Sequence, residues 1–441
     1  MNQRSLLTFF VWVYCLSWAF DYRGEEGGAT LVQVAFFGIT MGSAGCVILL
    51  GFRHLGILPG GWLILGWATY TGSTFIVAMV NHVPLGDYLR NLTTVLLVLM
   101  SMCVTQIAAG ARLSYKMVLY PMLIAGVINV AWRAFYTLGI QHKPLDMVRV
   151  EMLSQCLPML LAFMFAAMTL RTRRLLIPMA IGMFGLTSYV VSITRSAIFI
   201  IIAELAVCVW AVWKARQLGI LPKGFMNQKA RHLMGGIGVL VGALLILGVA
   251  APFVLERWEE RLFHPVGSDR SSADPSALTR FAETKAFITL LNAEPSTYIY
   301  GRGLGFHYYW DESYAVELAA YTYGNEDEFR SYYRDVAFPG HSIWTYAMFS
   351  GGVIGLLCYL GLFIVGTTWA FTSIKNLKIA RDFPIDIAFL PAVCLAGFLS
   401  LSLTFNPFIE RASSVTMGVM LVFPQFLILS AWRKQHGLRG P

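Results

Sequence analysis

The sequence predicts an all-α polytopic membrane protein with about twelve transmembrane helices, and two observations predict it. First, 57% of the 441 residues are hydrophobic and 13% are charged, whereas soluble domains carry about 25% charged residues. So few charges cannot cover the polar surfaces that a soluble chain of this length would need. Second, apolar stretches of about 20 residues, enough to cross the hydrocarbon core as a helix, recur along the chain. An ordinary cytoplasmic enzyme is therefore excluded.

The apolar stretches divide the chain into three parts. Residues 1–254 hold the first nine predicted spans, residues 255–339 form one large hydrophilic loop, and residues 340–441 hold three more spans and a short basic tail. The span Gly340–Phe371 is long enough to tilt or to protrude from the bilayer. The predicted spans are Ser5–Phe20, Ala29–Gly51, Leu58–Val80, Tyr88–Gly110, Met117–Leu138, Met152–Leu170, Leu175–Ile193, Ser196–Trp213, Leu233–Phe253, Gly340–Phe371, Ile385–Thr404 and Ala412–Trp432.

The distribution of charge predicts the orientation, because loops rich in lysine and arginine stay in the cytoplasm. The two termini and the alternate loops that face the same side hold 18 basic residues, and Asp382 is their single acid. The large loop holds eight basic and fourteen acidic residues. Both termini are therefore predicted to be cytoplasmic and the large loop external. The net charge of +9 comes from the basic cytoplasmic face and predicts no nucleic-acid partner.

The cysteines predict neither disulfides nor a metal site. All seven cysteines fall in predicted spans, and the large loop has none. No CxxC motif or Cys/His metal spacing occurs in the sequence. We expect these side chains to serve packing.

The large loop is predicted to be partly helical. Asp274 and Pro275 are typical of a helix N-cap followed by proline at the first helical position, and good helix formers continue from Ser276 to Asn292. Arg280 lies on this predicted helix. It is either a solvated helical arginine or a clamp for a phosphate or carboxylate group.

Two further features of the large loop could contact a ligand. Glycines alternate at Gly301, Gly303 and Gly305, which allows either a close backbone approach to a ligand or a tight turn. From Tyr298 to Tyr333 the loop holds nine tyrosines and Trp310. Aromatic side chains in such numbers suit either a membrane-interface belt or a platform for sugars.

Four ionisable residues near or within the spans are candidate functional residues. His341 opens a long span at the external boundary, where the positive end of a helix favours the neutral imidazole that can act as a base, although a structural role stays open. Arg195 lies in a short external turn, and its anionic partner is either a lipid phosphate or a substrate. Arg133 near the outer end of its span and Glu204 in mid-span are either functional or joined in internal polar contacts.

These residues can carry out one kind of chemistry without a metal or cofactor. No Asp-x-Asp motif accompanies them. Guanidinium groups can stabilise a departing diphosphate in place of a divalent ion. A diphosphate is weakly basic and needs no general acid, so only the attacking hydroxyl needs a base. The residues therefore indicate glycosyl transfer from a lipid diphosphate.

The same residues carry a resemblance to a known family. The order of Arg280, Pro295, the three alternating glycines and then His341-Ser342 opening a span that contains Gly351 and Gly352 resembles the O-antigen ligase / Wzy polymerase superfamily. The twelve predicted spans with one large loop before the last three resemble the O-antigen ligases in particular. The specific residues match over about Thr194–Ser196 and Thr279–Gly352.

The resemblance implies a fold, an activity and a site. It implies a membrane glycosyltransferase of the GT-C type that moves O-antigen polysaccharide from undecaprenyl diphosphate to lipid A–core, at the periplasmic face of the bacterial inner membrane. It implies His341 as the base and Arg195 and Arg280 as the residues that bind the diphosphate, with no metal. Inversion at the anomeric carbon is expected, because no second carboxylate is available as a nucleophile.

Three other functions stay open. An O-antigen polymerase would use the same donor but extends another lipid-linked glycan and tends to carry two sizeable external loops. A protein O-oligosaccharyltransferase would use the same base chemistry on a serine or threonine hydroxyl. A secondary transporter also fits twelve spans, but the sequence has no apparent repeat of its two halves, and its polar candidates gather at one face of the membrane.

Overall fold

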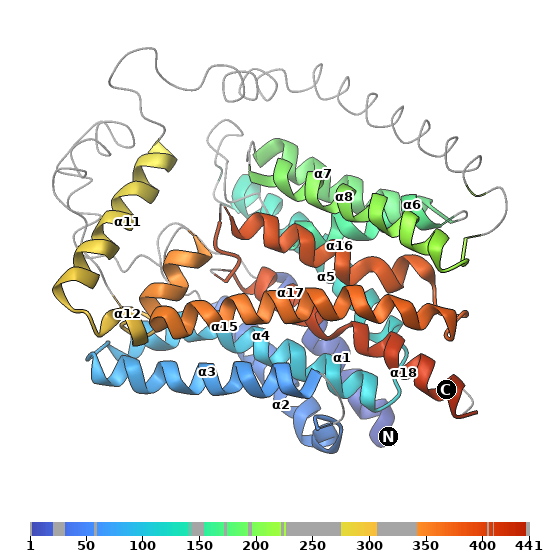
Figure 1. The fold of residues 1–441 in the computed structure, drawn as a ribbon, viewed down its shortest axis with the longest axis horizontal. Helices are drawn as coiled ribbons and strands as arrows, with labels where there is room; N and C mark the ends of the chain where they lie inside the picture. Colours follow the sequence, from blue (N-terminus) through green and yellow to red (C-terminus); the bar gives the residue numbers. More distant parts are fainter. Residues whose placement is uncertain are drawn as a thin grey trace, which may run out of the picture.

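A computed structural model describes most of the chain as a bundle of helices that run roughly along one direction (Figure 1). Both termini lie at one end of the bundle, which we call the terminal end, and helices α11 and α12 lie at the other, which we call the α11 end. The described residues are 2–20, 31–56, 60–140, 142, 154–171, 174–192, 196–221, 225, 275–306, 342–403, 405–408 and 410–437.

The fold is all-α over the described residues, with no β-strand among them. Short 3-10 turns and one π-helical turn, η3 at Phe135–Ile140, extend some of the helices. The α-helices are α1 Gln3–Ser17, α2 Leu31–Gly51, α3 Gly60–Val80, α4 Leu85–Gly110, α5 Lys116–Ala134, α6 Leu157–Leu170, α7 Leu176–Ser192, α8 Ser196–Gln217, α11 Pro275–Ala293, α12 Thr297–Tyr300, α15 Ile343–Ser373, α16 Ile385–Ser402, α17 Arg411–Val422 and α18 Pro424–Gln435.

The predicted membrane architecture is confirmed in its coarse form. Within the described residues, eight helices are long and apolar enough to cross a membrane, and α6 and α7 are shorter apolar helices. Every predicted span other than Leu233–Phe253 coincides with a described helix or a pair of consecutive helices. Leu233–Phe253 lies outside the described residues, so the total of twelve spans stays a prediction. The protein is a polytopic α-helical membrane protein.

The helix ends follow from local sequence. Asn2 caps α1 by accepting a hydrogen bond from the Ser5 backbone N–H at 2.8 Å. Ser342 caps α15 in the same way, accepting from the Thr345 backbone N–H at 3.3 Å. These side chains satisfy amide groups that a helix leaves without partners in its first turn.

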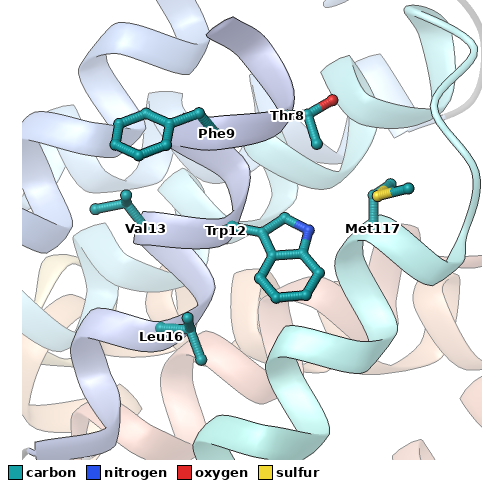
Figure 2. A pocket seen from close by; sticks show the side chains of 6 residues that line it. All are labelled: Thr8, Phe9, Trp12, Val13, Leu16 and Met117. Carbon is teal, nitrogen blue, oxygen red and sulfur yellow. The ribbon is translucent and has the colours of Figure 1, made fainter. Parts of the chain in front are cut away.

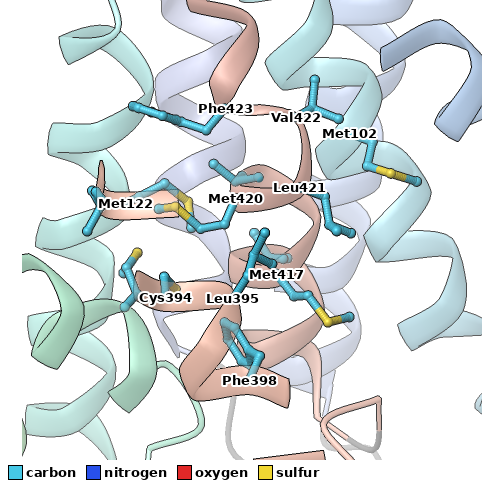
Figure 3. Close-up of a cluster of buried hydrophobic side chains, with 14 of the residues drawn as sticks. Met102, Met122, Cys394, Leu395, Phe398, Met417, Met420, Leu421, Val422 and Phe423 are labelled. Atoms are coloured by element: carbon cyan, nitrogen blue, oxygen red, sulfur yellow. The ribbon is translucent and has the colours of Figure 1, made fainter. Parts of the chain in front are cut away.

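One buried apolar cluster takes side chains from α4, α5, α16 and α17, and Figure 3 shows members of it from each of these helices. Met102 of α4, Phe398 of α16 and Met420 of α17 are fully buried there. These helices carry apolar residues on almost every face, because other helices, and not only lipid, enclose them. Five of the cysteines are buried and the other two, Cys46 and Cys358, are half-buried, and all seven are free thiols, as the sequence predicts.

Helix α15 is bent, which explains its unusual length. Gly352 has φ 59° and ψ −151°, outside the helical region, and divides the helix into a short first segment and a long second one. The predicted span Gly340–Phe371 is therefore one continuous apolar stretch but not one straight helix. The first segment packs against α11 and α12 at the α11 end.

The helix predicted in the large loop is present. Helix α11 begins at Pro275 and ends at Ala293, close to the predicted run Ser276–Asn292. Its apolar side chains Phe287 and Leu291 form a small buried cluster with Phe349 of α15. The Phe287 and Phe349 rings meet edge to face with centroids 4.6 Å apart.

Candidate functional site

The structure describes the predicted site residues unequally. His341 and Arg195 lie outside the described residues, and their predicted roles stay predictions. Arg280 lies on α11, and only its backbone is described. The surroundings of these residues are described in detail, and they indicate how the site is assembled.

A buried carboxylate connects α11 to the start of α15. Glu283 lies three residues after Arg280 on α11, and its side chain is 1% exposed. It accepts a hydrogen bond of 2.5 Å from the Thr345 hydroxyl in the first turn of α15. The Thr345 hydroxyl also lies 2.9 Å from the hydroxyl of Ser342, the N-cap residue. The start of α15 is thus attached to the helix that carries Arg280.

This contact also has an electrostatic basis. The amide groups at a helix N-terminus carry partial positive charge, which stabilises a nearby carboxylate. Hydrogen bonds to a charged group are stronger than neutral ones. Ser342 directly follows His341 in the chain. Glu283 therefore ties together the two chain segments that carry two of the predicted site residues, Arg280 and His341.

No sequence pattern singles out Glu283 as a functional residue. Glu283 lies on a helix with a weak apolar pattern. In such a sequence, a carboxylate that becomes buried cannot be distinguished from one that stays in solvent. The signal that could have found it is the Ser342-x-x-Thr345 capping pattern next to His341. The hydroxyl groups of such residues can donate hydrogen bonds to a neighbouring acid.

The three alternating glycines contact protein backbone. Gly301, Gly303 and Gly305 have φ values of 70°, 90° and 82°. A Cβ at Gly301 would lie 2.5 Å from the Gly351 backbone nitrogen, and one at Gly303 would lie 2.5 Å from the Cα of Ala78 in α3. Only glycine fits such positions without strain. A tight turn, the alternative to a ligand loop, is therefore what the described structure contains, and a binding role for the glycines stays a prediction.

This glycine turn is hydrogen-bonded to the bend in α15. The backbone N–H of Arg302 donates to the Phe349 carbonyl at 2.7 Å, and the N–H of Gly303 donates to the Ser350 carbonyl at 3.1 Å. The bend at Gly352 interrupts the helical hydrogen bonds of these carbonyls, and the glycine turn provides new donors for them. The Ser350 hydroxyl in turn lies 3.2 Å from the hydroxyl of Tyr70 in α3.

Arg302, the arginine inside the glycine turn, contacts side chains of the protein itself. Arg302 forms an ion pair with Glu294 and donates to the Asn81 side-chain oxygen at 3.0 Å. Its guanidinium lies 5.3 Å from the centroid of the Phe306 ring. Burial lowers the pKa of Arg302, but an arginine keeps its charge at neutral pH. Arg302 thus joins the turn to the end of α3.

Arg133 is buried in an ion pair. It lies in the last turn of α5, its side chain is 3% exposed, and it pairs with Glu410, the residue that precedes α17. The structure therefore shows the internal ion pair that was one of the two alternatives for Arg133. A role in binding the substrate stays a prediction. The π-helical turn η3 follows directly at Phe135, and such turns are frequent at functional sites.

Two other predictions have partial outcomes. Glu204 lies in mid-helix, as the sequence predicts, and its side chain is completely buried against Gly397 of α16, where an added Cβ would clash with the carboxylate. Of the tyrosines between Tyr298 and Tyr333, only Tyr298 and Tyr300 are described, and both are exposed on α12. The choice between an aromatic belt and a sugar platform stays open.

No metal-binding group occurs in the part of the chain that the structure describes, where no three His, Cys, Asp or Glu side chains come together. The class that the fold defines is a polytopic α-helical membrane protein in which a helix of the predicted large loop, α11, docks on the bent helix α15. The sequence matches no protein-family model and none of the curated proteins with which it was compared.

Proposed function

We propose that this protein is an O-antigen ligase that transfers O-antigen polysaccharide from undecaprenyl diphosphate to lipid A–core at the periplasmic face of the bacterial inner membrane. This proposal includes twelve spans, a fold of the GT-C type, cytoplasmic termini and a reaction without a metal. The observation that supports it best is the docking of α11 on the start of α15 through Glu283 and Thr345. This contact joins the segments of Arg280 and His341 at the membrane boundary.

In the proposed reaction His341 accepts the proton of the acceptor hydroxyl as the hydroxyl oxygen attacks the anomeric carbon. The bond between that carbon and the diphosphate oxygen breaks, and the electron pair leaves with the diphosphate. Arg195 and Arg280 stabilise the negative charge that the leaving group gains. A single displacement inverts the anomeric carbon.

Glu283 serves this mechanism as a positioning residue. A base and a phosphate-binding group contribute to catalysis only when their separation matches the transition state, and errors of about 1 Å are costly. Glu283 attaches α11 to Thr345 and so restricts movement between the two segments. The bent first segment of α15 needs this support, because Gly352 separates it from the rest of the helix.

The central test is His341→Ala in cells that lack the chromosomal gene and carry the variant on a plasmid. We expect loss of polymer-capped lipopolysaccharide and accumulation of polymer on the lipid carrier. His82→Asn is the matched control, because His82 is an exposed histidine with φ 55° in the turn between α3 and α4, where asparagine tolerates the positive φ. This variant should leave capping intact. Normal capping with His341→Ala would refute the assignment of His341 as the base.

The same strains distinguish the alternative functions. Shortened polymer on the lipid carrier would indicate a polymerase, and loss of glycan from protein would indicate a protein O-oligosaccharyltransferase. Purified protein that joins defined donor and acceptor without an ion gradient would exclude the transporter. We expect this reaction to proceed unchanged in the presence of a chelator.

A further inference from the structure

Three arginines from distant parts of the chain meet at the terminal end of the bundle, around the last turn of α4. The Arg4 guanidinium at the start of α1 donates to the Arg112 carbonyl at 2.9 Å. The Arg433 guanidinium near the end of α18 donates to the Ala109 carbonyl at 3.4 Å. The positive charges of Arg112 and Arg4 both act on Arg433. We call these three residues the arginine cluster.

No carboxylate of the described residues forms an ion pair with the arginine cluster. The acceptors of Arg4 and Arg433 are backbone carbonyls. The nearby acids pair with other basic residues: Asp382 with Lys434, and Asp386 with Arg171 at 2.7 Å. Carbonyl groups at a helix C-terminus offset positive charge only in part. Three like charges therefore remain close together at the membrane boundary.

An open apolar groove starts beside the arginine cluster. It has a volume of about 520 Å³ and is lined by Thr8, Phe9, Trp12, Val13 and Leu16 of α1 and by Met117 of α5 (Figure 2). The Thr8 hydroxyl donates to the Arg4 carbonyl at 3.0 Å, so it presents little polarity to the groove. Thr8 lies one helical turn beyond Arg4, and the groove continues along α1 to Leu16, within the predicted span Ser5–Phe20.

The arginines and the groove together match one kind of molecule. A phosphate group carries the negative charge that the cluster lacks, and guanidinium groups bind phosphate with several hydrogen bonds. A hydrocarbon chain attached to that phosphate fits an apolar groove that runs along a membrane-spanning helix. Basic pockets between helix ends are typical binding sites for anionic lipid headgroups.

We propose that the terminal end binds one anionic phospholipid, with its phosphate held by Arg4, Arg112 and Arg433 and one acyl chain in the groove between α1 and α5. The lipid connects α1, α4 and α18, whose ends carry the three arginines. A zwitterionic phospholipid is a poorer ligand, because its own cationic group adds to the positive charge already present. This site is independent of the proposed glycosyl transfer, which takes place at the α11 end.

The test is lipid binding by the purified full-length protein, measured by native mass spectrometry with phosphatidylglycerol and phosphatidylethanolamine in competition. We expect the wild-type protein to retain one phosphatidylglycerol per chain. The double variant Arg4→Gln with Arg433→Gln should bind it roughly 10- to 30-fold more weakly, since each basic residue near a lipid headgroup contributes about 1 kcal/mol.

The matched control is Arg216→Gln with Arg381→Gln, which removes two exposed positive charges outside the cluster, one in the last turn of α8 and one between α15 and α16. It should bind phosphatidylglycerol as the wild type does. Equal loss in the control would show general surface attraction and overturn the proposal, as would equal binding of phosphatidylethanolamine. Unchanged binding by the cluster variant would overturn it as well.

Two further measurements complete the test. Arg112→Asn is a single variant that keeps the backbone, because Arg112 has φ 61° and asparagine tolerates positive φ. It should also weaken binding if it folds like the wild type. Glycerophosphoglycerol, which has the headgroup but no acyl chains, should not displace the bound lipid; if it competes as well as phosphatidylglycerol, the groove does not hold a chain.

Discussion

Glu283 is the residue on which the geometry of the proposed site depends most directly. Its carboxylate is buried and accepts from Thr345 across the interface between α11 and α15. A buried acceptor that loses a donor keeps its desolvation cost, so single substitutions here should clearly lower the free energy of unfolding. Removal of either Arg133 or Glu410 would likewise break a buried ion pair and should destabilise the protein.

We expect Glu283→Ala to lower the free energy of unfolding by about 2 kcal/mol, because it removes a hydrogen bond to a charged group. Thr345→Val removes the donor, and the two substitutions together should cost clearly less than their sum, with a coupling of roughly 1 kcal/mol or more. The measurement is a double-mutant cycle on unfolding of the purified protein by SDS. Asn292→Ala, at an exposed position on the same helix, should be nearly neutral; additive costs would contradict the coupling.

At the scale of elements, the bend in α15 and the glycine turn form one unit. The turn supplies backbone donors to Phe349 and Ser350, and Gly352 permits the bend that frees those carbonyls. The alternation of these glycines in the sequence left both a ligand contact and a tight turn open. Their close approach is to backbone in α15, α3 and α4, so they shape the site even if no ligand touches them.

Gly301→Ala should therefore destabilise the protein by at least 1–2 kcal/mol, the cost of positive φ alone, with more from the clash at the Gly351 nitrogen. Gly361→Ala is the matched control on the second segment of α15, where an added methyl meets nothing within 4 Å. It should be neutral or stabilise the helix by up to about 1 kcal/mol. The two thermal unfolding midpoints check this, and a Gly301→Ala protein as stable as the wild type would refute the close packing.

At the scale of the whole molecule, groups of interacting polar residues lie at the two ends of the bundle. The arginine cluster lies at the terminal end, and Glu283, Arg302 and the glycine turn lie at the α11 end. The positive-inside rule relates these ends to the membrane and predicts that the terminal end faces the cytoplasm.

The orientation can be tested by labelling with a membrane-impermeant maleimide. His82→Cys, in the exposed turn at the α11 end, should react in cells whose outer membrane alone is permeabilised, whereas Arg381→Cys should react only after the inner membrane is opened. The native cysteines are buried or half-buried in helices that belong to the spans, so the wild type should give a low background. The opposite pattern would invert the predicted topology.

Sequence alone determined the membrane class, the positions of nearly all the described helices and the start of α11. These follow from local quantities, namely apolar length, capping residues and proline at the first helical turn, which need no knowledge of distant contacts. Sequence also singled out Arg133 and Glu204, because a charged residue within an apolar span is visible without a structure.

Tertiary structure alone decided which of these residues meet. Glu283 and Thr345 are 62 residues apart in the chain, Arg133 and Glu410 are 277 apart, and Arg4 and Arg112 are 108 apart. Such pairs depend on how the helices pack, and no local pattern encodes that packing. The bend at Gly352 also depends on the tertiary structure. A glycine in an apolar stretch is equally compatible with a straight helix. The bend is stabilised only because another segment donates hydrogen bonds to the carbonyls that the bend releases.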